Sequence, residues 1–336
     1  MPEFFQLTGI VVVFVTTFLV TFILTPLVAR TMRAHKIVGK DVHKVSKSEI
    51  PEMCGLAILL GLTIGTLSYV LLFPSAVRET AAFIGTLLIA GFIGFVDDLR
   101  PLSARIKPLL TAFACLPILL LGTYTPFPVI PLLGPVRLTI VYPVLLLPIA
   151  IAVTSNAVNM MDVMNGSMAG TVGIISLAVT AILFISGETT PAVLSAGLLA
   201  AMLAFYYFNR YPAKVFGGDT GSLGVGAALG ALSILGRIEA VMIVALIPHI
   251  MNAFYGLASV RGLRERREIR QRPTMLLDDG KLEASAEKRA PITLTRLILA
   301  KGPLGEREIV QGMMFLTAVS SILAFLTYWI TVVGKT

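Results

Sequence analysis

Long apolar runs recur along the whole chain, and no other feature restricts its possible folds as strongly. Crossing the ~30 Å hydrocarbon core of a bilayer takes about 20 mostly apolar residues. Of the 336 residues, 56% are hydrophobic and 14% are charged, whereas soluble domains carry about 25% charged residues. The sequence therefore predicts an all-α polytopic membrane protein with about ten transmembrane helices, in which residues 1–336 form a single integral membrane domain. The candidate spans are about residues 7–29, 53–74, 80–97, 106–122, 139–157, 168–187, 191–208, 217–235, 238–260 and 309–333.

The distribution of basic residues predicts the orientation of these spans. If both termini lie on one side, the loops on the other side are about residues 30–52, 97–107, 156–167, 209–216 and 261–308. These loops hold all of the 27 Lys and Arg except Arg78, Arg137, Arg237 and Lys335. Cytoplasmic loops are rich in Lys and Arg, so the loops are predicted to be cytoplasmic and both termini extracytoplasmic. Topology and anionic ligands then explain the net charge of +8, and nucleic acid is not an expected partner.

Several segments have recognisable local chemistry. Gly122–Leu138 carries four prolines among β-branched residues, which predicts a short extracytoplasmic β-hairpin or loop. Residues 261–308 are long and polar enough for a small cytoplasmic subdomain, and Asp279-Gly280 within them is a hairpin signal. The first apolar segment has no basic region before it and no cleavage site after it, which indicates a retained helix. Cys54 and Cys115 suggest neither a disulfide framework nor a zinc site.

Two adjacent carboxylates, Asp97 and Asp98, stand at the end of an apolar run, and Lys107 follows them. Ionisable groups near the hydrocarbon core cost several kcal/mol unless a cation or a water-filled cavity receives them. The pair is therefore a candidate functional site, with an interfacial loop as the alternative. Neighbouring residues of a helix lie ~100° apart, so the two carboxylates need not share a role.

A second polar motif also falls on the predicted cytoplasmic side. Its amide and carboxylate residues recur at every third position, at Asn156, Asn159, Asp162 and Asn165. On a helix or a tight turn this spacing keeps neighbouring members on one side. An asparagine-rich helix cap is the alternative, but four members in register exceed what capping requires.

A third motif, Phe216 to Gly224, opens a span. Its glycines permit close backbone approach, and a helix N-terminus there would favour an anion, against which Asp219 would hold a cation. The Gly-Lys-Ser/Thr ending of a Walker P-loop is absent. For Gly221, Gly224 and Gly226 the favoured interpretation is a small-residue face for helix packing.

Hard oxygen ligands on separate loops, without a histidine cluster or paired cysteines, favour Mg²⁺ or Mn²⁺ over zinc. Basic residues beside such a metal indicate a phosphate substrate, and as a set they fit a nucleoside diphosphate clamp. For each basic residue alone, a solvated or topological role is an equal alternative. The candidates are Lys44, Lys107, Arg270 and Arg272.

Together these motifs resemble the polyprenyl-phosphate N-acetylhexosamine-1-phosphate transferase superfamily, which is glycosyltransferase family 4. The resemblance lies in Asp97-Asp98 with Lys107, in the motif from Asn156 to Asn165-Gly166, and in Phe216-x-Gly218-Asp219-Thr220-Gly221-Ser222. Ten spans with external termini agree with it, so it covers nearly the whole chain.

Within the superfamily, several elements look most like the dolichyl-phosphate branch. These are the loop from Gly39 through Lys44 to Ile50-Pro51-Glu52, the segment Asn209 to Phe216, and Arg270-Gln271-Arg272-Pro273, where Gln271 replaces a histidine. Asp162 instead matches the bacterial pattern. That mixture is typical of an archaeal member.

The resemblance implies transfer of N-acetylglucosamine-1-phosphate from UDP-N-acetylglucosamine to dolichyl phosphate with release of UMP, the first lipid-linked step of N-glycan assembly. It implies that Asn159 and Asp219 bind Mg²⁺ on the diphosphate with Asp98 near it, Mn²⁺ being an alternative. Asp97 is the candidate for deprotonating or positioning the lipid phosphate, and a covalent aspartyl intermediate is less favoured.

The remaining site residues are also assigned by resemblance. Asn165 and the backbone near Phe216 would hold uracil, whereas Arg270, Arg272 and Lys107 would contact the phosphates and the developing charge. The other predicted site residues are Asp162, counted as catalytic, and Lys44, Glu52 and Asn156, counted as substrate-binding.

Alternatives of two kinds stay open. The enzyme could use another UDP-N-acetylhexosamine, or undecaprenyl phosphate for cell-envelope glycans. A secondary transporter would instead need repeated, interrupted helices and polar residues near mid-span. Membrane lipid is an expected partner in every case, and a homodimer is left open. The predicted location is the cell membrane of a prokaryote or the endoplasmic reticulum of a eukaryote.

Overall fold

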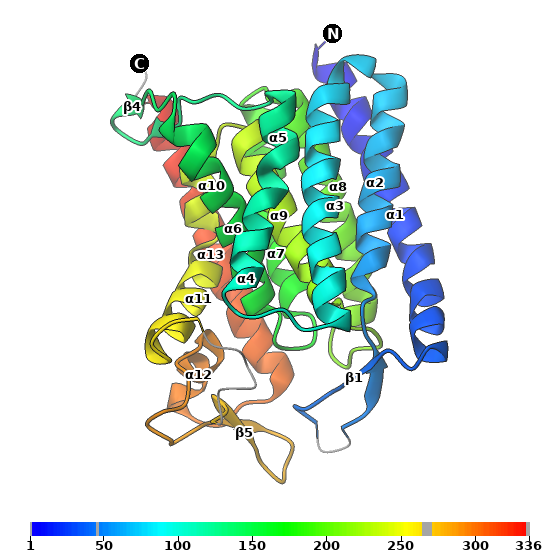
Figure 1. Ribbon diagram of the computed structural model, residues 1–336, viewed down its shortest axis with the longest axis vertical. Coiled ribbons are helices and arrows are strands. Elements are labelled where there is room, and N and C mark those ends of the chain that lie inside the picture. The colour runs from blue at the N-terminus through cyan, green and yellow to red at the C-terminus, as the bar shows by residue number, and fades with distance from the viewer. Residues whose placement is uncertain (1, 45–46, 264–270, 334–336) are drawn as a thin grey trace.

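The computed structural model describes residues 2–44, 47–263 and 271–333. Long helices run roughly side by side between two ends of the molecule (Figure 1). They are α1 (Pro2–Ala34), α2 (Gly55–Leu72), α3 (Val77–Leu99), α6 (Leu147–Met161), α7 (Ser167–Ile185), α8 (Thr189–Asn209), α9 (Gly218–Leu235) and α13 (Glu306–Val333). Shorter helices are α4 (Ile106–Ala112), α5 (Leu116–Leu121), α10 (Glu239–Ala245), α11 (Ile247–Ser259) and α12 (Leu294–Ile298).

The polytopic all-α prediction is confirmed. Within the described ranges, seven helices are long and apolar enough to cross a membrane. Every predicted span contains helix, although the count of ten spans stays a prediction. Helix α1 carries a stripe of half-exposed apolar side chains at every fourth position, which is suited to contact with lipid tails. The stripe consists of Leu7, Val11, Val15, Leu19, Ile23 and Leu27.

Two predicted spans are broken in the structure. The span predicted at 238–260 is the pair α10 and α11, bent by 68°. Pro248 lies in the first turn of α11, where it lacks the N–H that a continuous helix would need. The span predicted at 106–122 is interrupted by a 3₁₀ turn at Phe113–Cys115, and Pro117 begins α5 after it. Proline therefore divides both segments.

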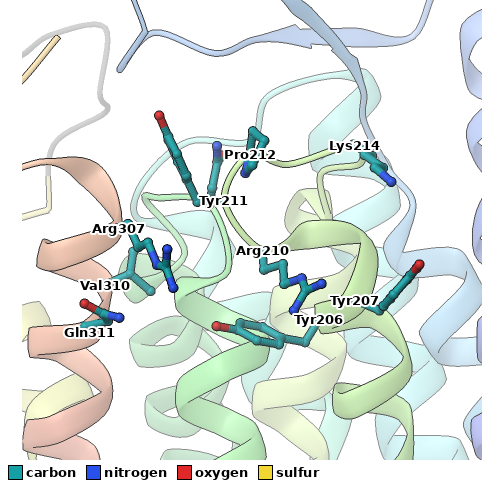
Figure 2. Close-up of a pocket in the computed structure, with 10 residues that line it drawn as sticks. Tyr206, Tyr207, Arg210, Tyr211, Pro212, Lys214, Arg307, Val310 and Gln311 are labelled. Carbon is teal, nitrogen blue, oxygen red and sulfur yellow. The ribbon is translucent and has the colours of Figure 1, made fainter.

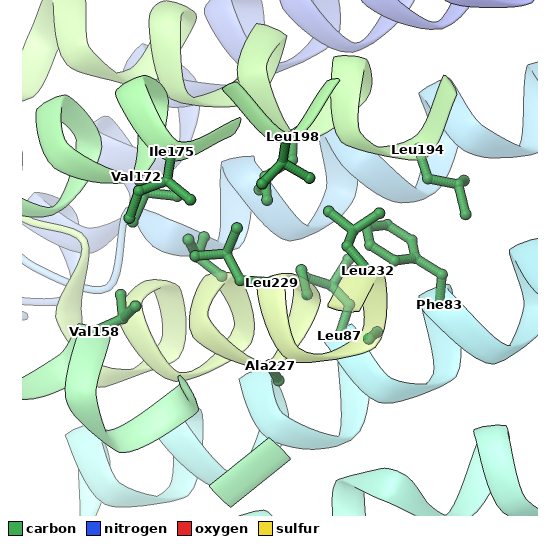
Figure 3. Close-up of a cluster of buried hydrophobic side chains, with 14 of the residues drawn as sticks. Phe83, Leu87, Val158, Val172, Ile175, Leu194, Leu198, Ala227, Leu229 and Leu232 are labelled. Atoms are coloured by element: carbon green, nitrogen blue, oxygen red, sulfur yellow. The ribbon is translucent and has the colours of Figure 1, made fainter. Parts of the chain in front are cut away.

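Helix α9 occupies the centre of the bundle, and all of its residues from Thr220 to Leu235 are buried. It packs against α3 and α6. Leu229 and Leu232 of α9 lie among apolar side chains of α3, α7 and α8 (Figure 3). Helix α9 starts beside the ends of α2, α3 and α6, so groups in its first turn are contacted from several sides.

Small residues allow these close contacts. A Cβ added to Gly226 would lie 2.6 Å from Ser155 Cα of α6, and one added to Gly224 would lie 2.6 Å from Leu59 of α2. A Cβ on Gly221 would approach Gly55 Cα to 3.0 Å. The predicted small-residue packing face of α9 is confirmed, since larger side chains would push the helices apart.

Both termini lie at one end of the bundle, and the larger polar loops lie at the other (Figure 1). Near the termini, β3 (Val129–Ile130) pairs with β4 (Gly134–Pro135), which confirms the predicted hairpin. At the opposite end, β1 (Val38–Lys40) pairs with β2 (Glu49–Pro51). There β5 (Thr274–Leu276) and β6 (Leu282–Ala284) form the second predicted hairpin, around Asp279-Gly280.

Candidate active site

Asp98 joins the end of α3 to the first turn of α9. Its Oδ1 accepts a hydrogen bond from Asp219 N–H at 2.8 Å, and its Oδ2 accepts from Thr220 N–H at 2.9 Å and Thr220 Oγ1 at 2.6 Å. The first N–H groups of a helix have no partner within the helix, and a carboxylate there also complements the helix dipole. Asp98 therefore caps α9 from a neighbouring helix.

Gly218 makes this cap possible. Its φ is +69°, a backbone conformation that favours glycine. A Cβ added there would lie 2.6 Å from Asp98 Oδ2. The glycine of the Phe216-to-Gly224 motif is thus required both by the turn and by the approach of the carboxylate.

Lys107 connects Asp97 of α3 with Asp219 of α9. Its Nζ lies 2.5 Å from Asp97 Oδ2 and also forms an ion pair with Asp219 Oδ2. Asp97 Oδ1 accepts a hydrogen bond from Leu102 N–H at 2.5 Å, which turns the chain back so that α4 can present the lysine. The adjacent carboxylates of α3 therefore have different partners, as their ~100° separation on a helix allows.

Helix α6 adds amide groups to this cluster. Asn159 Nδ2 donates to Asp219 Oδ1 and to Ser222 Oγ, both at 2.8 Å. Asn156, one turn earlier, donates from Nδ2 to Thr111 Oγ1 at 2.8 Å. The structure thus brings together Asp97, Asp98, Lys107, Asn159 and Asp219, while Asn156 ties α6 to α4 beside them.

Asp162 follows the last residue of α6. Its Oδ2 lies near Gly217, since a Cβ on that glycine would be 3.7 Å away. Burial, and next the negative charge of Asp219, raise the pKa of Asp162 from its usual 3.8 to about 7. A carboxyl with a pKa near neutral pH can serve as either an acid or a base.

Asn165 lies beyond Asp162, and acidic residues from distant parts of the chain hold it. Its Nδ2 donates to Asp41 Oδ2 at 3.1 Å, and its backbone N–H donates to Glu306 Oε1 at 2.8 Å. Lys44 pairs with Asp41 at 2.6 Å and lies 4.9 Å from the centre of the Tyr211 ring. Lys44 and Asn165 therefore belong to one buried polar group next to the loop after α8.

The β1–β2 hairpin is attached to the start of α9 through the main chain. Phe216 N–H donates to Pro51 O at 2.8 Å, and Cys54 N–H donates to Phe216 O at 2.9 Å. Glu52 and Phe216 both lie against Gly39, because a Cβ on that glycine would be 3.2 and 3.1 Å from their side chains. The predicted Glu52 and Phe216 are thereby brought together at this junction.

Comparison with known proteins places the chain in a family. Residues 80–237 match the model of glycosyl transferase family 4. A provisionally named glycosyltransferase of Methanocaldococcus jannaschii is 31% identical over 88% of this chain and 89% of its own length.

The chain belongs to glycosyl transferase family 4.

Other members of the family carry more specific names. A Saccharolobus solfataricus protein, provisionally named a UDP-N-acetylglucosamine–dolichyl-phosphate N-acetylglucosaminephosphotransferase, is 28% identical over 98% of this chain and 99% of its own length. A Bacillus subtilis protein, provisionally named an undecaprenyl-phosphate N-acetylglucosaminyl 1-phosphate transferase, is 34% identical over 72% of this chain and 67% of its own length. The predicted resemblance to polyprenyl-phosphate sugar-1-phosphate transferases is confirmed.

The two arginines predicted in the last loop remain to be placed. Arg270 lies outside the described residues. Arg272 is exposed just before β5, and the described contacts do not connect it with Asp219. Their assignment to the phosphates of a substrate stays a prediction.

A cavity of about 390 Å³ opens beside Asn165, between the end of α8 and the start of α13. Arg307 and Gln311 of α13 line one side of it, and Tyr206 and Arg210 line the other (Figure 2). Sequence reasoning missed these residues. It also missed Asp41 and Glu306 as partners of Asn165, because contacts across more than 100 residues leave no spacing signal in one sequence.

Proposed function

We propose that this family 4 glycosyl transferase moves N-acetylglucosamine-1-phosphate from UDP-N-acetylglucosamine to dolichyl or another polyprenyl phosphate and releases UMP. The observation that carries the proposal is the Saccharolobus solfataricus relative, whose name states this activity and which aligns over 98% of this chain. The ion-pair cluster at the ends of α3, α4, α6 and α9 supplies the chemistry that such a transfer needs.

In the proposed reaction, an oxygen of the lipid phosphate attacks the β-phosphorus of the donor. The bond between that phosphorus and the bridging oxygen breaks, and UMP leaves with the electron pair. Phosphoryl transfer depends mainly on positioning and on neutralising negative charge. Lys107 would compensate charge on the phosphates, and Asp97, which it contacts at 2.5 Å, would orient the lipid phosphate.

The donor set of the cluster fits Mg²⁺, with Mn²⁺ as an alternative. Asp219, Asp98 and Asn159 offer oxygen atoms of the kind that hard divalent cations prefer, and Asn159 and Asp98 both contact Asp219 or its backbone. When bound, the metal would neutralise charge on the diphosphate. Asp162, whose Oδ2 lies near Gly217 just before α9, would hold or move a proton near this centre.

The substrate-binding residues surround this centre in the proposal. Asn165 and the backbone near Phe216 would contact the uracil, with Lys44, Glu52 and Asn156 supporting that side. Arg270 and Arg272 would contact the phosphates. The end of the bundle that holds the cluster would face the cytoplasm, because the basic loops gather there, and both termini would lie outside.

The Bacillus subtilis relative favours a second acceptor, undecaprenyl phosphate, for the same type of reaction. A donor with a different N-acetylhexosamine is the matching alternative on the sugar side. Both keep the cluster in the same role and differ only in the substrates that the surrounding loops accept.

The test is transfer of label from β-³²P-labelled UDP-N-acetylglucosamine to dolichyl phosphate by the purified full chain, with Mg²⁺ or with EDTA. We expect metal-dependent lipid labelling, an equal yield of UMP, and loss of both in Asp219→Asn. Asp279→Asn is the matched control, because that carboxylate is 57% exposed and its ion pair with Lys281 spans 3.8 Å. No labelling of either dolichyl or undecaprenyl phosphate would reject the proposal.

A further inference from the structure

We propose that Asp41 is a positioning residue that determines which nucleotide base this site accepts, because it fixes the orientation of the Asn165 side-chain amide. The inference rests on the proposed function, in which the donor is a uridine nucleotide and Asn165 contacts its base. Asp41 itself would not touch the substrate.

Asn165 is held at both its main chain and its side chain. Asn165 and Asp41 are each 3% exposed, and Glu306 is 4% exposed. Asp41, just after β1, accepts from Asn165 Nδ2, and Glu306, at the start of α13, accepts from Asn165 N–H. Gly166 follows with a φ of +87° and packs against Tyr206. The residue therefore has little freedom to shift or rotate.

The chemistry of Asp41 decides which end of the amide faces it. An ionised carboxylate only accepts hydrogen bonds, whereas an asparagine amide has a donor end and an acceptor end. The amide must therefore turn its NH₂ group toward Asp41, and the Lys44 ammonium at 2.6 Å compensates the buried negative charge. Asn165 Oδ1 is left pointing away from the carboxylate.

That oxygen is available to a ligand. Asn165 lines the cavity of about 390 Å³ beside α8 and α13. The hydrogen bond to Asp41 uses Nδ2 and does not engage Oδ1. A fixed acceptor beside a cavity favours a ligand with an N–H at that point.

Uracil and cytosine differ at the corresponding edge. Uracil presents an N3–H between two carbonyl groups, whereas cytosine presents an N3 lone pair beside an amino group. Asn165 Oδ1, held in place by Asp41, would accept a hydrogen bond from uracil N3–H. With cytosine the same oxygen would face the N3 lone pair, and the two acceptors would repel each other. Sites that leave a buried polar group unpaired by the wrong ligand discriminate strongly, so we expect at least about a tenfold preference for uridine.

The test is the dissociation constant of UMP and of CMP, measured by titration calorimetry on the full chain in detergent. The wild type should bind UMP at least about tenfold more tightly than CMP. In Asp41→Asn the new amide can donate or accept a hydrogen bond, so the Asn165 amide can rotate by about 180°. The ratio of the CMP to the UMP dissociation constant should then fall toward one. Asp41→Ser, whose hydroxyl also donates or accepts, gives the same measurement if the first variant does not fold.

Asn252→Ala is the matched control. Asn252 is also buried, its Nδ2 donates to Met160 O at 2.8 Å, and its Oδ1 accepts from Leu294 N–H at 2.9 Å. Its loss removes two inter-element hydrogen bonds, one more than the loss of the Asp41 contact with Asn165, without touching the cavity lining. We expect lower stability and an unchanged UMP-to-CMP ratio.

The outcomes separate the two proposals. A uridine preference that persists in the Asp41 variants would overturn the role of Asp41 and leave the proposed function intact. Equal affinity of the wild type for UMP and CMP would also overturn the role of Asp41 and leave the proposed function intact. A wild type that binds neither nucleotide would overturn both.

Discussion

Replacing Lys107 with methionine tests whether its ammonium holds the centre together. The side chain keeps nearly the same length, so the change removes charge with little loss of packing. The carboxylates of Asp97 and Asp219, which Lys107 contacts from α4, would then face each other without a cation between them. Helices α3 and α9 would be pushed apart by like charge where they now meet.

The expected cost follows from the exposure of these groups. Removing one partner of a buried ion pair costs about 3–5 kcal/mol. Lys107 is 18% exposed and Asp219 is 28% exposed, so water screens part of the repulsion and we expect the lower end. A loss of about 3 kcal/mol corresponds to ~150-fold in the unfolding equilibrium.

The assay is denaturant unfolding of the wild type and Lys107→Met in detergent, first in EDTA and then with Mg²⁺. The variant should be destabilised in EDTA, and Mg²⁺ should restore more stability to it than to the wild type, because a bound cation replaces the ammonium charge. The control is Lys281→Met, whose pair with Asp279 spans 3.8 Å at the surface and should be worth less than about 1 kcal/mol. If Lys107→Met and Lys281→Met unfold alike in EDTA, the reasoning is refuted.

Three further predictions concern other parts of the molecule. Gly218→Ala should lower the free energy of unfolding by about 1–3 kcal/mol from backbone strain alone. The new Cβ would lie 2.6 Å from Asp98 Oδ2 and would displace that carboxylate, so the variant should also lose transfer in the radiolabel assay. Asp162 has a folded-state pKa of about 7 against its usual 3.8, so folding favours its protonated form, and this contribution is lost as pH rises from about 4 to about 7. The melting temperature of the wild type should therefore fall more steeply than that of Asp162→Asn across this range, and the two should run parallel above it. Tyr142→Phe removes the hydrogen bond to Glu239 at the end of the bundle away from the cluster, and should cost about 1–3 kcal/mol in unfolding with unchanged activity per folded molecule.

Each of these predictions has a contradicting result. Gly280→Ala is the control for backbone strain, since Gly280 has a φ of +82° with nothing within 4 Å of an added Cβ; a Gly218→Ala variant as active as Gly280→Ala would reject the contact argument. Parallel pH curves for the wild type and Asp162→Asn would show that the carboxyl titrates as it does in the unfolded chain. Loss of activity in folded Tyr142→Phe would mean that this end of the bundle takes part in the reaction.

The periodic features of the fold could be predicted from the sequence, and the breaks in it were harder to place. Apolar length located helix in every predicted span, and turn chemistry located the hairpins at Gly122–Leu138 and Asp279-Gly280. The bend before Pro248 was missed, because the apolar run continues through it and hydropathy carries no information about helix direction. Pro248 is visible in the sequence, but the direction of the bend between α10 and α11 depends on how the two helices pack.

The candidate site shows the same division. The sequence by itself determined the chemical inventory, because carboxylates, amides and a lysine at the ends of apolar runs are costly there unless they meet one another. The tertiary structure decided which groups contact one another. Asp97 forms an ion pair with Lys107, whereas Asp98 accepts hydrogen bonds from the first turn of α9, although Asp97 and Asp98 are adjacent in the sequence. It also set Asp41 and Glu306 around Asn165. Hydrogen bonds and ion pairs act over a few ångströms of space, so residues far apart in the chain become partners only when helix packing brings them within that distance.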